Sequence, residues 1–275
     1  MDGKKRKLEK ARNLVSIVVI LAVMIVLMAG CSDLGGSPGS NDDEFEIKGY
    51  MSHALSYEVA NVGKPSAEVL KNEEFCDAAA VVTNNTDDLY WLIVLTPVAY
   101  DKEGNEIEDA FIDGYFEDDA LTEFKKTDPS VVAMNIGAGE SVMTYKQFML
   151  AEGIEEPDHI EWKIDKKIEK KTESPTMGLE VTDMSYSGGE ISCTVNNNSD
   201  NDYSRIDIDV LLLDEDGYLV PGLPIGGEYL DEDTMEPKPV PAHTSFSYYE
   251  DLNIWDLKDG LPANAEVYVS VPDEE

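Results

Sequence analysis

The chain has few basic residues and few histidines. It carries 21 lysines and arginines against 57 aspartates and glutamates, which gives a formal net charge of −36. Such an acidic surface repels nucleic acid, whose recognition needs a basic face. The three histidines, His53, His159 and His243, are far apart in the sequence and share no metal-ligand spacing. We therefore expect no nucleic-acid partner, and we interpret each histidine as a surface residue.

Cysteine is equally scarce, with three residues in the chain. Cys76 alternates in phase with Ala78 and Ala80, and Cys193 alternates with Ile191 and Val195. This pattern places each thiol on the inward face of a different strand. We predict two separate buried thiols, and a disulfide between them is the alternative.

A catalytic constellation is also lacking. Residues 35–39 match the formal spacing of a hydrolase nucleophile elbow around Ser37, but they lack the strand before the serine and the helix after it. The many carboxylates form pairs by chance, and no pair stands out as a glycosidase dyad. We predict a protein that is not an enzyme and has no cofactor, and a surface hydrolase is the alternative.

Only one long apolar run is present, at residues 14–29, and it follows a cluster of lysines and arginines. The run is several residues shorter than the roughly 20 that a membrane-spanning helix needs. This layout is typical of a signal peptide. The residues Met28-Ala29-Gly30-Cys31 that end it resemble the bacterial lipobox, in which the cysteine thiol accepts a diacylglycerol before cleavage. The resemblance implies residues 1–30 as a signal peptide and Cys31 as a lipidated N-terminus; an uncleaved anchor or a generic secretory signal is the alternative.

A segment rich in glycine, serine and acidic residues follows, and we interpret residues 31–44 as a flexible tether. Removal of residues 1–30 takes away six basic and two acidic residues, leaving 15 against 55 and a net charge of about −40. The acidity indicates either a solvated surface or attraction for calcium or a cationic partner. The patterned apolar residues beyond Glu44 predict a folded region.

An internal repeat sets the expected architecture. A shift of 113 residues aligns residues 82–104 with residues 195–217 and gives eight identities in 23 positions. The shift shortens to 104 near Ile136 and Val240, which indicates a nine-residue insertion in the first copy. A later match aligns Trp162 with Val269, at a shift of 107.

Each copy is predicted to contain a strand, an asparagine-rich turn, a second strand with period-two alternation, and a hairpin turn that ends in Gly104 or Gly217. Several short strands in about 100 residues predict an all-β protein with two tandem immunoglobulin-like antiparallel β-sandwich domains. We expect domain 1 at residues 45–165, with its insertion near 105–135, a linker at 166–176 and domain 2 at 177–275. A short helix is expected at residues 115–126, and the lysine cluster near residue 166 is expected to be solvated linker.

The asparagine turn, the alternating strand and the following Tyr100-Asp101-x-x-Gly104 and Leu213-Asp214-x-x-Gly217 together resemble the FxLYD-type domain of bacterial surface lipoproteins. Telokin-like immunoglobulin modules in such lipoproteins are similar. The resemblance implies a surface module with no catalytic residues to carry over. Its phenylalanine position is Pro97 in the first copy and Val210 in the second.

The two copies differ in one strand. Arg205, Asp207 and Asp209 form a polar face in the second copy, whereas the first copy has Leu92, Val94 and Thr96 there, with Trp91 beside them. A strand that is apolar on both faces is covered on both faces. Either the insertion or the neighbouring domain covers Trp91, Leu92 and Val94, or these residues bind a partner.

The acidic loops suggest a second kind of site. Asp231, Glu232 and Asp233, together with Asp214 and Asp216, could supply oxygen ligands for calcium, although they lack the EF-hand loop pattern. The sequence therefore predicts a lipoprotein anchored on the extracytoplasmic face of the cell membrane. Its predicted role is a non-catalytic binding, adhesion or envelope-assembly module with a protein or envelope partner. A calcium- or small-solute-binding lipoprotein is the alternative.

Overall fold

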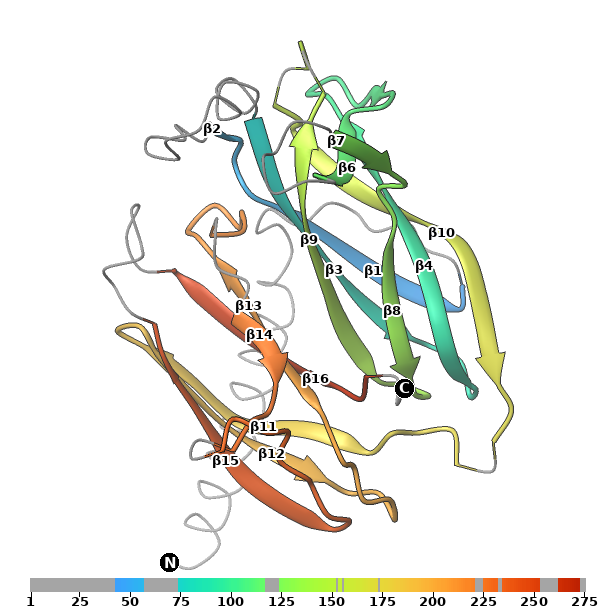
Figure 1. Cartoon of the computed structure of the whole chain (residues 1–275), viewed down its shortest axis with the longest axis vertical. Coiled ribbons are helices and arrows are strands. Elements are labelled where there is room, and N and C mark those ends of the chain that lie inside the picture. Colours follow the sequence, from blue (N-terminus) through green and yellow to red (C-terminus); the bar gives the residue numbers. More distant parts are fainter. Residues whose placement is uncertain are drawn as a thin grey trace, which may run out of the picture. The chain divides into compact units, whose positions relative to one another are not determined.

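The computed structural model describes most of the chain from residue 43 onward: residues 43–56, 74–116, 124–151, 153–154, 156–172, 174–220, 225–231, 234–252 and 262–272. Every regular element in these ranges is a β-strand, and every strand of the four sheets pairs antiparallel with its neighbours. The expected all-β antiparallel sandwich fold is therefore confirmed (Figure 1). Signal peptide, Cys31 and most of the tether lie outside the described residues.

The first half of the folded region, residues 45–170, contains two sheets. Its strands are β1 (Phe45–Met51), β2 (Leu55–Ser56), β3 (Glu74–Asn84), β4 (Leu89–Tyr100), β5 (Glu106–Ile107), β6 (Phe111–Phe116), β7 (Phe124–Thr127), β8 (Val131–Ile136), β9 (Ser141–Leu150) and β10 (His159–Lys170). One sheet has the order β1-β3-β9-β6-β7, with β2 beside β3. The other has the order β10-β4-β5, with β8 beside β4.

The second half, residues 179–272, also contains two sheets. Its strands are β11 (Leu179–Ser187), β12 (Glu190–Asn197), β13 (Asp207–Leu213), β14 (Ile225–Glu228), β15 (Thr244–Asp251) and β16 (Asn264–Ser270). The sheets have the orders β11-β12-β15 and β14-β13-β16. This pattern repeats the β1-β3-β9 and β8-β4-β10 pairings of the first half (Figure 1).

The strand register confirms the internal repeat. Val82 pairs with Val142 in the first half, and Val195 pairs with Phe246 in the second, so both the 113-residue and the 104-residue shifts hold. The later shift of 107 is wrong by two residues. Trp162 pairs with Pro97, and the position equivalent to Pro97, Val210, pairs with Val267. Because a slip of two residues keeps a strand's side chains on the same face, the hydrophobic pattern alone did not reveal the error.

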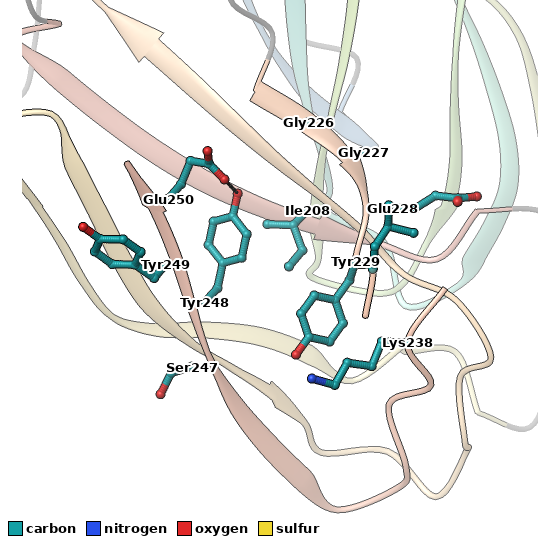
Figure 2. Close-up of a pocket in the computed structure, with 11 residues that line it drawn as sticks. Ile208, Gly226, Gly227, Glu228, Tyr229, Lys238, Ser247, Tyr248, Tyr249 and Glu250 are labelled. Carbon is teal, nitrogen blue, oxygen red and sulfur yellow. Dashed lines mark hydrogen bonds between the residues drawn. The ribbon is translucent and has the colours of Figure 1, made fainter. Parts of the chain in front are cut away.

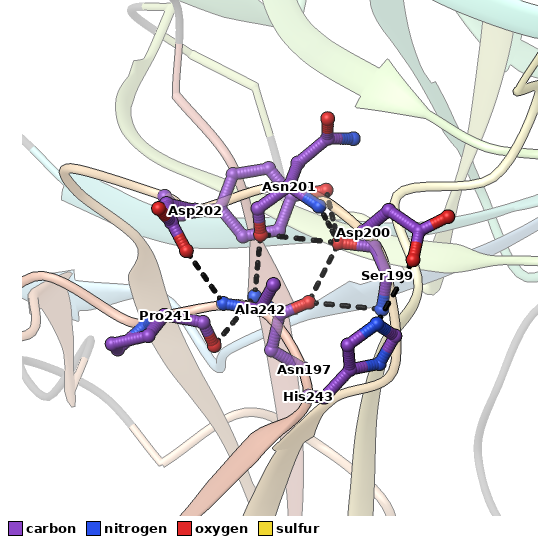
Figure 3. Close-up of polar contacts among 9 residues, drawn as sticks. Asn197, Ser199, Asp200, Asn201, Asp202, Pro241, Ala242 and His243 are labelled. Carbon is purple, nitrogen blue, oxygen red and sulfur yellow. Dashed lines mark hydrogen bonds and ion pairs between the residues drawn. The ribbon is translucent and has the colours of Figure 1, made fainter.

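The asparagine turn is built identically in the two halves. The buried Asn84 side chain donates from Nδ2 to the carbonyls of Asp88, Ile136 and Gly137, at 2.7, 3.0 and 3.1 Å. Asn197 donates in the same way to Asn201, Val240 and Pro241, at 2.8, 3.2 and 3.1 Å. Figure 3 shows the contacts with Asn201 and Pro241. In each half the asparagine Oδ1 also accepts from the amide and hydroxyl two residues on, Thr86 or Ser199. One buried side chain thus ties the turn to the strand that arrives about 50 residues later.

The two predicted hairpin turns are also confirmed. Gly104 and Gly217 adopt φ of 79° and 85°, a left-handed conformation that is costly for residues with a Cβ. Asp101 Oδ1 accepts from the amides of Glu103 and Asn105, and Asp214 Oδ1 accepts from Asp216 and Tyr218. These glycines and aspartates therefore stabilise the two hairpin turns.

Each half has its own apolar core. The core of the first half contains Trp162 and Phe148, each about 1% exposed, together with residues from both of its sheets. Trp162 Nε1 donates to the carbonyl of Ala79 at 3.1 Å, which satisfies the one polar atom of its ring. The second half encloses smaller clusters, one around Val195 and Ile208 and another around Val210 and Leu212.

A further apolar cluster joins residues of the two halves. The outer face of β1, β3 and β9 contributes Tyr50, Ala79, Val81 and Met143, with Tyr145 packed against them, and the second half contributes Leu211, Leu213 and Leu219, with Tyr268. Strand β3 is consequently buried on both faces over most of its length. The pKa of Tyr50 rises to about 12, chiefly because burial in this cluster disfavours the phenolate.

Polar contacts support the junction between the halves. Glu140 accepts from the amides of Gly137, Met177 and Gly178, at 3.0, 3.0 and 2.7 Å, and burial raises its pKa. Asn135 Nδ2 donates to the carbonyl of Val271 at 2.8 Å. The Glu140 contacts fix the connecting chain against the end of the first half.

Two sequence expectations need correction. The helix expected at 115–126 is wrong, because β6 and β7 pair antiparallel through Tyr115 and Lys125, while residues 117–123 lie outside the described residues. Strand β6 joins the larger sheet through Phe111 and Ile112, which pair with Leu150 and Met149 of β9. Part of the expected linker is also strand: β10 continues through Lys170, so Lys166 and Lys167 pair with Val94 and Ile93.

Candidate functional site

A groove in the second half, lined by Tyr229, Tyr248 and Tyr249, is the candidate site. It has a volume of about 460 Å³ and lies between β14 and β15, at the edges where neither strand has a partner among the described residues (Figure 2). We call it the tyrosine groove, formed by residues 226–230, residues 247–250, Ile208 and Lys238. Within the described chain β14 pairs only with β13, and β15 pairs only with β12.

The alternation of β15 positions its aromatic residues. Phe246 and Tyr248 point inward against the core, while Ser247 and Tyr249 point outward, and Tyr249 is 57% exposed. This follows from the period-two geometry of a strand at the edge of a sheet. The run Thr244-Ser-Phe-Ser-Tyr carries this alternation in the sequence, where Tyr249 aligns with Tyr145 of the first copy.

Two tyrosine rings form the walls of the groove. Tyr229 stacks on Phe246 with ring centroids 4.1 Å apart and an interplanar angle of 14°. Lys238 places its ammonium 5.3 Å from the centre of the Tyr229 ring, a cation–π distance. Across the groove Tyr248 donates its hydroxyl to Glu250 Oε2 at 3.3 Å, and burial followed by the Glu250 charge raises the pKa of Tyr248 (Figure 2). The groove therefore combines aromatic faces with carboxylates.

An acidic cluster lies on the face of β13 opposite to the one where Ile208 lines the groove. Asp209 is directed over Gly226, where an added Cβ would lie 2.4 Å from Asp209 Oδ1, so a larger residue at this position would displace the carboxylate. Burial, followed by the charge of Asp207, raises the pKa of Asp209 to about 7. Arg205 Nε lies 2.7 Å from Glu228 Oε1 and 3.9 Å from Asp207 Oδ1. The predicted polar face of this strand is present, but Asp209 is far less exposed than the alternation alone indicates.

The predicted partner-binding residues lie on β4. Leu92 and Val94 are half-buried, and they pair with Met134 and Val132 of β8, so these four side chains share one outer face. Val132 is 42% exposed, and Trp91, on the same strand, is half-buried. The apolar face that the second half covers is instead that of β3, through Ala79 and Val81.

Of the candidate calcium ligands, the structure describes Asp214, Asp216 and Asp231. Asp214 is engaged in its hairpin turn, and Asp231 accepts from the amide and hydroxyl of Thr234 at 3.1 and 3.2 Å. Glu232 and Asp233 lie outside the described residues. No group of three or more potential metal ligands is found in the part of the chain that the structure describes.

The histidines and cysteines occupy separate environments. His53, His159 and His243 each lie near a different carboxylate, those of Glu156, Asp158 and Asp200, at 2.8, 3.2 and 2.9 Å. His53 also stacks on Tyr218, with centroids 4.1 Å apart. Cys76 and Cys193 are buried free thiols in different core clusters, as predicted, and burial raises the pKa of Cys76 to about 12. A thiol with this pKa is not a nucleophile at neutral pH.

The fold and groove define an all-β protein of antiparallel sheets with a recessed aromatic site on two strand edges. No model of a known protein family and no curated protein sequence matches this chain. Within the described residues, no helix has the length and apolarity needed to span a membrane.

Proposed function

We propose that the protein is an exported lipoprotein, anchored through a lipid on Cys31 at the extracytoplasmic face of the cell membrane, that acts as a non-catalytic binding module. Residues 1–31 support the anchor by charge, apolar length and their resemblance to the lipobox. Two lipid chains on one cysteine would hold the protein firmly at a bilayer. The two halves would be tandem domains of the FxLYD-type or telokin-like kind.

The observation that carries the binding role is the tyrosine groove. The groove has unpaired strand edges within the described residues, walls formed by Tyr229 and Tyr248, and an exposed Tyr249. These features are typical of recognition sites rather than of a closed core. The half-buried apolar face of Leu92 and Val94, with Trp91 on the same strand, is proposed as a second contact surface. A partner-binding assay with Leu92→Lys tests that surface, because a folded variant that loses binding supports it and an unfolded variant contradicts it.

The anchor is tested by metabolic labelling with radioactive palmitate in a bacterial host. We expect label in the wild-type chain, loss of label in Cys31→Ser, and a mature N-terminus at Cys31 by mass spectrometry. A labelled Cys31→Ser variant, or a mature N-terminus elsewhere, would contradict the anchor. Release of the Cys31→Ser chain from the membrane fraction is the expected functional consequence.

The binding role is tested with the groove itself. The double variant Tyr229→Ala and Tyr249→Ala should weaken capture of partners from the cell envelope, whereas Tyr186→Phe, on β11, should not. Crosslinking on intact cells measures the difference. Unchanged crosslinking in the double variant would exclude the groove as the binding site.

A further inference from the structure

We infer that the tyrosine groove binds an extended, positively charged segment of a partner protein, which pairs as an added strand with the free edge of β15. This inference rests on the proposed binding function and names the chemistry of its partner. It depends on three observations: the strand that pairs at the end of the equivalent edge in the first half, the reversed charge beside that edge, and the tyrosine rings in the groove.

The first half shows a strand added at the end of the equivalent edge. Strand β9 occupies the place of β15 in the repeat and pairs with β3 on one side, as β15 pairs with β12. On its other side β9 pairs with β6, through Leu150 with Phe111 and Met149 with Ile112. Within the described residues β15 ends at Asp251 and pairs only with β12; the positions equivalent to Met149 and Leu150 follow the end of β15. An unpaired edge presents backbone amides and carbonyls in register for another strand.

The charge at the edge is reversed between the halves. Lys146 of β9 donates its ammonium to Asp113 of the inserted strand β6 at 2.5 Å. The register places Glu250 at the equivalent position of β15, because Ala78 pairs with Lys146 and its counterpart Ile191 pairs with Glu250. A strand that repeats the β6 contact against Glu250 must supply a lysine or arginine where β6 supplies an aspartate.

The tyrosine rings fit the same chemistry. Lys238 already holds its ammonium 5.3 Å from the Tyr229 ring, so this surface accommodates a cation over an aromatic face. The Tyr248 hydroxyl donates to the Glu250 carboxylate and so holds it at the groove. The net charge of −36 attracts cationic segments from a distance and repels a second copy of the chain.

The test uses the full-length protein in a non-ionic detergent and three fluorescent eight-residue peptides. The first alternates valine and lysine, the second alternates valine and glutamate, and the third is the valine-lysine peptide N-methylated at every second amide. N-methylation removes strand hydrogen bonds without changing charge. Fluorescence polarisation should show the valine-lysine peptide binding at least about tenfold more tightly than either of the others, a gap of about 1.4 kcal/mol.

The groove variant is Glu250→Lys, and its matched control is Glu108→Lys, which makes the same charge change on an exposed turn of the first half. Lysine is compatible with this strand, because Lys146 stands at the equivalent position of β9. We expect Glu250→Lys to lower the affinity for the valine-lysine peptide at least about tenfold and to raise the affinity for the valine-glutamate peptide. Glu108→Lys should change the affinity for either peptide by less than about twofold.

Three outcomes would overturn the inference: no binding of the valine-lysine peptide, equal losses in the two variants, or full binding of the N-methylated peptide. Circular dichroism melting of each variant shows that it is folded. The palmitate readout is independent of these measurements. A correctly lipidated chain that does not bind the peptides would therefore contradict the inferred binding of a cationic strand and would leave the proposed anchor supported.

Discussion

The two halves present the same sheet face in opposite environments. Ala79, Val81, Met143 and Tyr145 project from the outer face of β3 and β9, and residues of the second half cover them. At the equivalent positions, β12 and β15 carry Ser192, Thr194, Ser247 and Tyr249. Ser247 is exposed, and Tyr249 is 57% exposed.

This difference shows that the same arrangement of strands can carry different outward-facing residues in the two halves. Inward positions keep the same character, since Ile93 and Ile206 are both fully buried and Tyr90 and Tyr203 are both buried. The residue type at outward positions instead depends on the environment of the face. These positions carry small or apolar residues where the other half packs against the sheet, and hydroxyl-bearing residues where the sheet faces water. The repeat therefore conserves the core and diversifies the surface.

The largest expected effect comes from a charge on the covered face. Val81→Asp should lower the free energy of unfolding by about 3 to 5 kcal/mol, because the carboxylate would be buried among leucines without a partner. The equivalent Thr194→Asp should cost about 1 kcal/mol or less, since that face is uncovered. Urea unfolding measures both. Equal losses in the two variants would show that the faces are not in different environments.

The asparagine turns should respond alike in both halves. Asn84→Ala and Asn197→Ala should each lower the free energy of unfolding by about 2 to 4 kcal/mol, because each removes the buried amide group that ties the turn to the arriving strand. Thermal melts followed by circular dichroism compare the two. Asn201→Ala is the control, because its side chain is exposed and only its backbone takes part in the turn. A large effect at only one of the two asparagines would contradict their structural equivalence.

The third prediction concerns pH and the buried acidic face. The pKa of Asp209 is about 7 in the folded chain and near its ordinary 3.8 when unfolded. The folded state holds the proton longer, so stability falls as pH rises from about 4 to about 7 and stays lower above that. Asp209→Asn should therefore stabilise the protein by roughly 2 kcal/mol at pH 8, after allowance for partial solvent contact, and by less at pH 5.

Urea unfolding at both pH values tests this, with Asp216→Asn as the exposed control. A gain from Asp209→Asn that is the same at pH 5 and pH 8 would show that ionisation of this carboxyl is not the cause.

The smallest expected effects on stability are those of substituting Tyr145 and Tyr249, which occupy equivalent positions in the two halves. Tyr145→Ser should cost about 1 to 2 kcal/mol, because Tyr145 packs against the cluster between the halves. Tyr249→Ser, at the equivalent position, should change stability by less than about 0.5 kcal/mol. Chemical denaturation with tryptophan fluorescence resolves the difference. If Tyr249→Ser were the more costly change, that tyrosine would not be the exposed member of the pair.

Much of the fold was accessible from the sequence. The repeat placed Asn84 with Asn197 and Gly104 with Gly217, and the structure shows the same turns at both. These features are local or depend on periodicity, which the sequence displays directly. The inserted segment was harder, because its strand state depends on the pairing of β6 with β7 and of β6 with β9, which no periodicity in the segment displays. The match of Trp162 failed by two residues, because only cross-strand register separates two alignments of equal parity.

The candidate site was less accessible. Apolar residues on both faces of β4 drew attention to Leu92 and Val94, while the doubly covered strand is β3, whose alanines look unremarkable in the sequence. The tyrosine groove combines β13, β14, β15 and Lys238, which are separated in the sequence by up to about 40 residues. Neither the free edge of β15 nor the burial of Asp209 can be read from alternation, because both depend on which strands lie beside them.

By itself the sequence determined the all-β class, the repeat with its turns, the acidic charge and the lipobox-like cysteine, since these are properties of spacing and composition. Only the tertiary structure decided which face of each sheet is covered, which strand edge is left unpaired and how far the pKa of Asp209 rises. The reason is physical: periodicity assigns a side chain to one face of a strand, but its burial and pairing depend on contacts between residues far apart in the chain.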